Sequence, residues 1–122
     1  MSRTSNELRD RTKRYASAVV RLFISLPRNH AAAQVLGKQL LRSGTSVAAN
    51  FREAARARTG TEFASKVELC AQEADESDLW LELLRDDCGI KDAGIDWLLT
   101  ETNELIAIFV TMAKRTKVKA EN

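Results

Sequence analysis

The sequence predicts an all-α protein, an antiparallel up-down-up-down four-helix bundle. The 122-residue chain contains one Pro and five Gly, so few residues interrupt helices. Four stretches carry apolar residues alternately three and four positions apart, which is the spacing of one buried helix face. Short links separate the stretches, and short links make consecutive helices antiparallel neighbours. The length fits a single domain over residues 1–122.

The first two helices are expected over about residues 5–26 and 30–58. The segment "TSNE" fits a capping box, in which a hydroxyl caps the backbone amides and Glu7 reaches back. Pro27 ends the first helix, and Asn29 can cap the second. Their buried positions are Leu8, Thr12, Tyr15, Val19, Leu22 and Leu26, then Leu36, Leu40, Ser43, Val47, Asn50, Ala54 and Ala57.

The third and fourth helices are expected over about residues 62–87 and 93–117. Thr59 and Glu62 form a second capping box, Gly89 ends the third helix, and Asp92 can cap the fourth. The tail "KRTKVKAEN" is expected to fray. The buried positions are Phe63, Val67, Cys70, Ala74, Ser77, Leu81 and Leu84, then Ile95, Leu98, Thr102, Leu105, Phe109 and Met112.

The stretch "RSGTSVAANFREA", residues 42–54, places small and polar residues where a core would be expected. A tight link near Gly60 makes facing positions of the second and third helices sum to about 120, so Ser43 faces Ser77. Such a polar layer disfavours slipped registers, because a shift leaves its groups unpaired. The expected members of the layer are Ser43, Ser46, Asn50 and Ser77, and Arg42 is expected near Glu76 and Asp78. A ligand site on Asn50, Glu53 and Glu73 is the alternative.

Charge is distributed unevenly along the chain. Residues 1–58 carry twelve basic and three acidic side chains, whereas the remainder carries seven basic and fourteen acidic ones. Such asymmetry fits either a nucleic-acid-binding face or a basic hairpin packed on an acidic one. No apolar run reaches the roughly 20 residues that cross a bilayer, and no signal sequence is evident, so we expect a cytoplasmic protein without a membrane role.

Catalytic and metal sites find little support. His30 lies in a link with no glutamate three residues before it, so a di-iron motif is missing. Cys70, Cys88 and His30 lack zinc-ligand spacing, and Glu73 with Glu76 is a weak carboxylate pair for a cation. We therefore expect no enzyme activity, no cofactor and no metal. The two tryptophans are interpreted as packing residues rather than base-stacking platforms.

The runs "QLLRSGTSVAANFREA" and "EFASKVELCAQEADESDLWLELLRD" carry a specific resemblance over roughly residues 30–87. Here the chain resembles the bacterial four-helix-bundle family named for proteins encoded in intervening sequences of 23S ribosomal RNA genes. Phe51 departs from the pattern, in which a smaller aliphatic residue is usual. The resemblance marks these residues as structural signature positions: Arg42, Ser43, Ser46, Asn50, Glu53, Glu73, Glu76, Trp80 and Leu81.

The resemblance also carries expectations about function. Members of this family resemble the accessory variability proteins of diversity-generating retroelements, which form homopentamers with a positive surface and bind nucleic acid and a reverse transcriptase. A homo-oligomer, with a pentamer favoured, is therefore expected. Apolar residues outside the buried positions, among them Phe51, Leu69, Leu79 and Trp80, could form the subunit contact.

The function expected from charge placement and the resemblance is a non-catalytic accessory or adaptor that binds RNA, DNA or a nucleic-acid enzyme. Both chain ends emerge at one end of such a bundle, so two basic clusters can combine there. The alternative is a purely protein-binding module whose basic residues are consumed by salt bridges. The candidate nucleic-acid-binding residues are Arg3, Lys13, Arg14, Arg21, Lys114, Arg115, Lys117 and Lys119.

Overall fold

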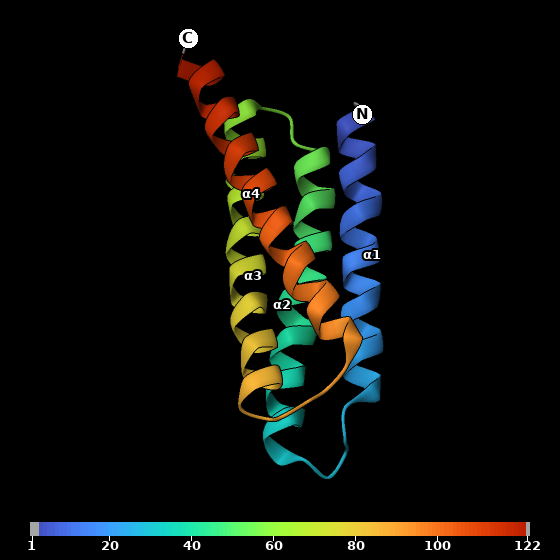
Figure 1. Ribbon diagram of the computed structural model, residues 1–122. Helices are drawn as coiled ribbons and strands as arrows, with labels where there is room; N and C mark the ends of the chain where they lie inside the picture. The colour runs from blue at the N-terminus through green and yellow to red at the C-terminus, as the bar shows by residue number, and fades with distance from the viewer. Residues whose placement is uncertain (1–2, 122) are drawn as a thin grey trace.

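The computed structural model describes residues 3–121, with side chains for residues 4–119, and contains four helices and no strand over that range (Figure 1). Helix α1 spans Arg3–Ser25, α2 Ala31–Ala55, α3 Gly60–Asp86 and α4 Ala93–Glu121. Each helix packs on the next in the chain, and α4 returns to α1, so the helices surround one core as an antiparallel four-helix bundle. The predicted fold class is confirmed.

Two features of α2 differ from the sequence prediction. Its N-cap is His30 rather than Asn29, because the His30 Nδ1 accepts a hydrogen bond from the Ala33 amide at 3.2 Å. The helix ends at Ala55, three residues before the expected end. There the amides of Arg56 and Ala57 bond to carbonyls only three residues back, which tightens and stops the helix.

The ends of the other helices follow their capping residues. Helix α1 begins at Arg3, one residue before the expected cap Thr4. Thr59 Oγ1 accepts from the Glu62 amide at 3.0 Å at the start of α3, as expected. Gly89 adopts a left-handed φ of 67° after α3, and Asp92 Oδ1 accepts from the Gly94 amide at 2.7 Å to cap α4.

The C-terminal tail continues α4 to Glu121 rather than fraying. Contacts with α3 explain the difference: Lys117 forms an ion pair with Glu68, and Thr116 lies beside Gly60. The part of α4 around Thr116 and Lys117 therefore packs against the start of α3. Tertiary contact overrides the weak helix preference of a charged chain end.

The core follows most of the predicted buried positions, but Leu36, Asn50, Ala57, Phe63 and Met112 are only half-buried. Phe51, expected outside the buried stripe, is fully buried, and its ring centroid lies 6.1 Å from that of Phe109. A helix in a bundle buries a stripe wider than two positions per heptad, so the residue after Asn50 turns inward. Asn50 itself is only half-buried.

Buried hydroxyl groups form a polar layer across the middle of the bundle. Ser43 and Ser77 lie 2.7 Å apart between α2 and α3, which confirms the predicted pairing. A second pair joins α1 to α4, where the Tyr15 hydroxyl lies 2.6 Å from Thr102 Oγ1. Ser46 and Asn50 do not take part, because the Asn50 amide donates to the Ser46 carbonyl within α2.

The directions of these hydrogen bonds follow from the helix carbonyls. Thr102 donates to the Leu98 carbonyl at 2.6 Å, so Tyr15 donates to Thr102. Ser77 donates to the Glu73 carbonyl at 2.9 Å, so Ser43 donates to Ser77. Burial raises the pKa of Tyr15 to about 12, although the hydroxyls of Thr102 and Ser77 act in the opposite direction. The phenol is therefore a neutral donor.

Two glycines let α2 approach α1 closely. A Cβ atom at Gly44 would lie 2.8 Å from Val19 Cγ2, and one at Gly37 would lie 2.5 Å from Leu26 Cδ1. Gly37 and Gly44 are one heptad apart, so both face α1. The small residues of α2 thus pack against two helices: Gly37 and Gly44 face α1, and Ser43 faces α3.

We expect Gly44→Ala to destabilise the fold by about 2 kcal/mol, since buried Val19 is β-branched and cannot rotate away cheaply. The added Cβ outweighs the gain in helix propensity of about 1 kcal/mol. Urea unfolding measures the change. In a Val19→Ala background the cost should fall by more than half. Gly60→Ala is the control, because its Cβ would meet only Thr116 Cγ2 at 3.6 Å; equal costs at both glycines would contradict the close contact.

Alkaline pH should weaken the fold through Tyr15. Its pKa is about 12 in the folded state, so the unfolded chain loses the phenolic proton first, and stability falls as pH rises from about 10 to 12. Tyr15→Phe should cost about 1 kcal/mol at pH 8 and lose about 1 kcal/mol less than the parent between pH 8 and pH 11. Urea titrations at both pH values test this, and an unchanged pH response in the variant would refute it.

Candidate nucleic-acid interface

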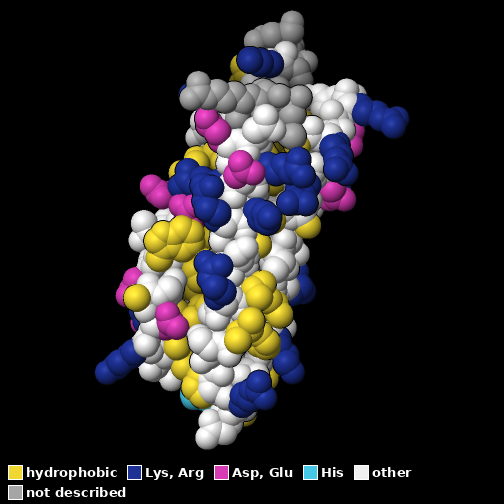
Figure 2. All heavy atoms as spheres, turned by 90° about the vertical axis from the view of Figure 1, so that its right-hand side faces the viewer, with side chains coloured by type: hydrophobic (Ala, Val, Ile, Leu, Met, Phe, Trp, Pro, Cys, Tyr) yellow, Lys and Arg dark blue, Asp and Glu magenta, His cyan; other side chains and the backbone are white. Residues whose placement is uncertain are grey.

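Helix α1 presents cations that have no partner within the described part of the chain. Lys13, Arg14 and Arg21 are exposed, and none forms an ion pair with a described side chain. In Figure 2, which views the bundle from the α1 side, Lys and Arg side chains outnumber Asp and Glu side chains across this face. These three cations are therefore exposed without a described ion-pair partner, and their role in binding stays a prediction.

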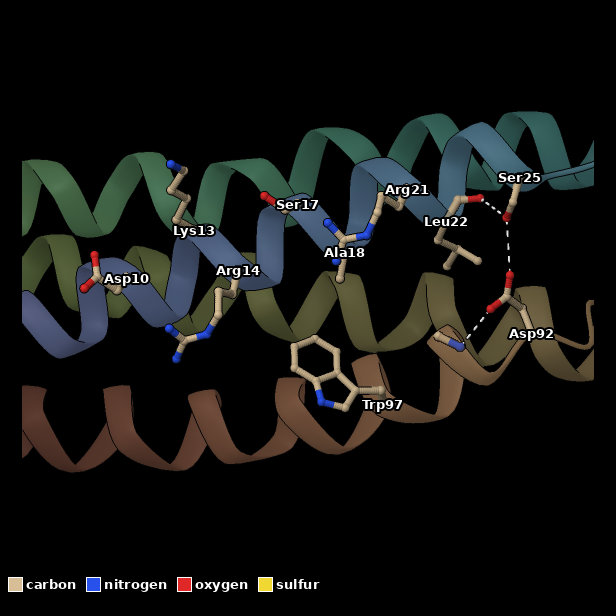
Figure 3. Close-up of a pocket in the computed structure, with 11 residues that line it drawn as sticks. Asp10, Lys13, Arg14, Ser17, Ala18, Arg21, Leu22, Ser25, Asp92 and Trp97 are labelled. Carbon is tan, nitrogen blue, oxygen red and sulfur yellow. Dashed lines mark hydrogen bonds between the residues drawn. The ribbon is translucent and has the colours of Figure 1, made fainter.

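A groove of about 730 Å³ runs between α1 and the first turns of α4. Arg14 and Arg21 line it from α1, and Trp97 lines it from α4 (Figure 3). The Arg14 side chain points toward α4, whereas Lys13 points away from it. The carboxylates of Asp10 and Asp92 also line the groove. We call this hollow the α1–α4 groove.

Links between α1 and α4 bound the groove at both ends. At one end, Ser25 Oγ lies 3.3 Å from Asp92 Oδ2, and Asp92 also caps α4. Toward the other end, Arg11 donates to both Glu101 oxygens, at 2.8 Å and 2.7 Å, and to Glu104 at 3.0 Å. The hydrogen bonds from Arg11 lower the pKa of Glu101, although partial burial acts in the opposite direction. Arg11 is thus paired with two carboxylates, whereas Arg14 forms no ion pair with a described side chain.

Trp97 is the residue of this groove that the sequence interpretation missed. It was expected to pack in the core, yet 47% of the residue is exposed. Figure 3 shows its ring projecting from α4 into the space beside α1, between Arg14 and Arg21. The available signal was its place between the buried positions Ile95 and Leu98, which turns it outward.

A second hollow, of about 540 Å³, lies on the other side of α1 against α2. Lys13 and Arg21 line it from α1, and Arg52 lines it from α2. Ala48 and Ala49 form part of its wall and leave room there, because their side chains are small. Cations of α1 therefore stand on a ridge between two hollows.

Two of the C-terminal cations lie beside α3. Lys114 and Lys117 line a hollow between α3 and α4, and Lys117 is paired with Glu68. Both chain ends lie at one end of the bundle, but the last turns of α4 lean over α3 (Figure 1). Lys114 and Lys117 therefore lie on the α3 side of α4, and the combination of the two basic clusters stays a prediction. Arg115 and Lys119 are exposed, and the side chain of Arg3 lies outside the described residues.

The signature residues of α2 and α3 are engaged with each other. Arg42 bridges Glu73 at 3.1 Å and Glu76 at 2.8 Å, as expected for Glu76. Asp78 was also expected there, but it accepts from the Asn103 amide at 3.2 Å, on the α4 side of α3.

The alternative ligand site on Asn50, Glu53 and Glu73 does not assemble. Glu53 pairs with Lys66 at 3.4 Å and Glu73 with Arg42 at 3.1 Å, while the Asn50 amide bonds within α2. The three side chains therefore satisfy separate partners.

The remaining signature positions are structural. Leu81 is fully buried, and Trp80 is partly buried against the core. The Trp80 Nε1 is buried without a hydrogen-bond partner among the described residues.

Metal-ligating side chains stay apart among the described residues, and Cys70 is buried. No three His, Cys, Asp or Glu side chains among them come together as a metal site. Burial raises the pKa of Cys70 to about 12, so its thiol stays neutral. Over residues 3–121, no helix has the length and apolar character that a membrane span needs.

Comparisons with known proteins agree with the fold. The family model described as 23S rRNA-intervening sequence protein matches residues 4–111. The chain belongs to this family. It is also similar to the crystal structure of a protein of unknown function from the S23 ribosomal protein family of Bacteroides thetaiotaomicron, with 32% identity and a TM-score of 0.80. That similarity covers 90% of this chain and 97% of the other. A search of curated proteins found no match.

The family match extends the resemblance seen in the sequence. It includes α1 and most of α4, in addition to the signature runs of α2 and α3. The descriptions of the family and of the similar structure name no enzyme activity.

Proposed function

We propose that this member of the 23S rRNA-intervening sequence protein family is a non-catalytic, homo-oligomeric accessory protein that binds nucleic acid through α1. The observation that carries the proposal is the set Lys13, Arg14 and Arg21, exposed on one face and without ion-pair partners among the described residues. Cations of this kind bind phosphates by releasing counterions, without reading a sequence.

Ion pairs neutralise only some of the basic residues. Arg42, Lys66 and Lys117 are paired with glutamates of α2 and α3, as the protein-binding alternative requires. Lys13, Arg14 and Arg21 form no ion pair with a described side chain, and they line the hollows that flank α1. Cations gathered along a groove suit a phosphate backbone, so their placement favours nucleic-acid binding over the purely protein-binding alternative.

Self-association is the second part of the proposal. Ile24 is 74% exposed and Val35 62% exposed, and α3 exposes Leu69 and Leu79. Phe51 no longer supports a subunit contact, because it is buried. A pentamer is favoured by the resemblance to accessory variability proteins, and a ring would repeat the α1 face and add avidity to a weak site.

Neutralising the α1 face should weaken binding to a labelled RNA or DNA oligonucleotide. For Lys13→Gln, Arg14→Gln and Arg21→Gln combined, we expect at least a tenfold loss at about 50 mM salt and a log–log salt slope shallower by about 2. Fluorescence anisotropy across a salt series measures both quantities.

Two matched control variants test whether the loss of binding is specific to the cations of α1. Lys38→Gln with Arg58→Gln removes exposed charge away from the α1 face, and Lys114→Gln with Arg115→Gln removes it from the end of α4. Both should bind within about threefold of the parent, since their cations lie outside the grooves that flank α1. No binding by the parent protein at low salt would refute the nucleic-acid role and leave the protein-binding alternative.

The mass in solution tests self-association. We expect five times the chain mass of 13.6 kDa by light scattering or sedimentation equilibrium, and the triple α1 variant should keep that mass. A monomeric parent protein would contradict the oligomer and remove the avidity that a ring supplies.

A further inference from the structure

We infer that the α1–α4 groove binds single-stranded nucleic acid by stacking an unpaired base on Trp97 while Arg14 and Arg21 hold the adjacent phosphates. The inference rests on the proposed function and names the form of nucleic acid that the site takes. It depends on one juxtaposition: the exposed indole of Trp97 and the side chains of Arg14 and Arg21 line the same groove of about 730 Å³ (Figure 3).

Trp97 is exposed within the α1–α4 groove. A tryptophan needed only for packing buries most of its ring, whereas this residue is 47% exposed and stands in the groove rather than on an open surface. Indole rings bind nucleobases of any sequence through their flat faces. In duplex DNA or RNA the bases are stacked on each other, so a ring at the base of a groove reaches only an unpaired one.

The charges around Trp97 suit a strand rather than a neutral aromatic ligand. Arg14 and Arg21 lie along α1 on either side of the ring, and neither has an ion-pair partner among the described residues. Of the two carboxylates lining the groove, Asp92 is engaged by the Gly94 amide and Ser25. Asp10 lies at the far end, beyond Arg14 (Figure 3).

The hollow between α1 and α2 extends the basic surface along which a strand would lie. Lys13 and Arg21 line both the α1–α4 groove and the α1–α2 hollow, and Arg52 adds a cation on the far side. A strand lying across α1 therefore meets cations continuously, as single-strand-binding surfaces require. A free nucleotide would use only the part of this path beside Trp97.

The test compares Trp97→Ala and Trp97→Phe with the control Val118→Ala, since Val118 is 57% exposed on α4 and lines neither hollow beside α1. The probes are a single-stranded 12-mer of thymidine, a duplex of that length, an abasic strand of that length, and thymidine monophosphate. Trp97→Ala should weaken single-strand binding roughly 10-fold, and Trp97→Phe should lose less, because base–aromatic stacking is worth about 5- to 100-fold per base. Val118→Ala should bind like the parent.

The base and the strand are tested separately. Trp97→Ala should leave abasic-strand and duplex binding unchanged, since neither offers a base to the indole. In a Trp80→Phe protein, the single strand should quench the remaining Trp97 fluorescence and the abasic strand should not. Binding of the monophosphate as tight as that of the strand would overturn the strand assignment.

Failure of this inference is distinguishable from failure of the proposed function. If the parent protein binds the single strand and Trp97→Ala binds it equally well, stacking is refuted while electrostatic binding by α1 stands. If the parent protein binds neither strand nor duplex at low salt, the proposed function itself fails.

Discussion

The buried layer of hydroxyl groups sets the alignment of all four helices. Two pairs span it, Tyr15 with Thr102 and Ser43 with Ser77, at 2.6 Å and 2.7 Å. Each pair ends on a helix carbonyl, because Thr102 donates to Leu98 and Ser77 donates to Glu73. A slip of any helix by one turn would replace a hydroxyl with an apolar neighbour and leave a buried polar group unpaired, at about 1–3 kcal/mol each. Apolar packing alone would tolerate such a slip far better.

The α1–α4 groove depends on that alignment. Tyr15 lies one residue after Arg14, and Thr102 lies on α4 beyond Trp97, so their hydrogen bond fixes how far the indole stands from the guanidinium groups. The same pairing keeps α4 close to α1 at the level of the polar layer, while its final turns lean toward α3. A groove remains where the two helices are held together at a few points rather than packed along their length.

The sequence predicts side-chain contacts between α2 and α3 better than contacts between α1 and α4. The pairing of Ser43 with Ser77 followed from counting outward from a tight link, because α2 and α3 form a local hairpin. No such count relates α1 to α4, which are brought together only by closure of the bundle. The sequence pattern therefore predicts Trp97 as a packing residue, whereas 47% of it is exposed, and it does not predict that Lys114 and Lys117 face α3. Phe51 shows a further limit, since a two-position stripe underestimates what a bundle helix buries.

The order of helices around the bundle explains why positive charge stays uncompensated on α1. Eight of the 17 acidic residues are on α3, which lies diagonally across from α1 and packs on α2 and α4 instead. The basic residues of α2 reach that helix, as Arg42 does with Glu73 and Glu76. On the α1 side the acids of α4 within reach are Glu101 and Glu104, and Arg11 engages both. Lys13, Arg14 and Arg21 therefore form no ion pair with a described side chain, although Asp10 and Asp92 line the same groove, and an external anion such as a phosphate backbone is the partner that their placement favours.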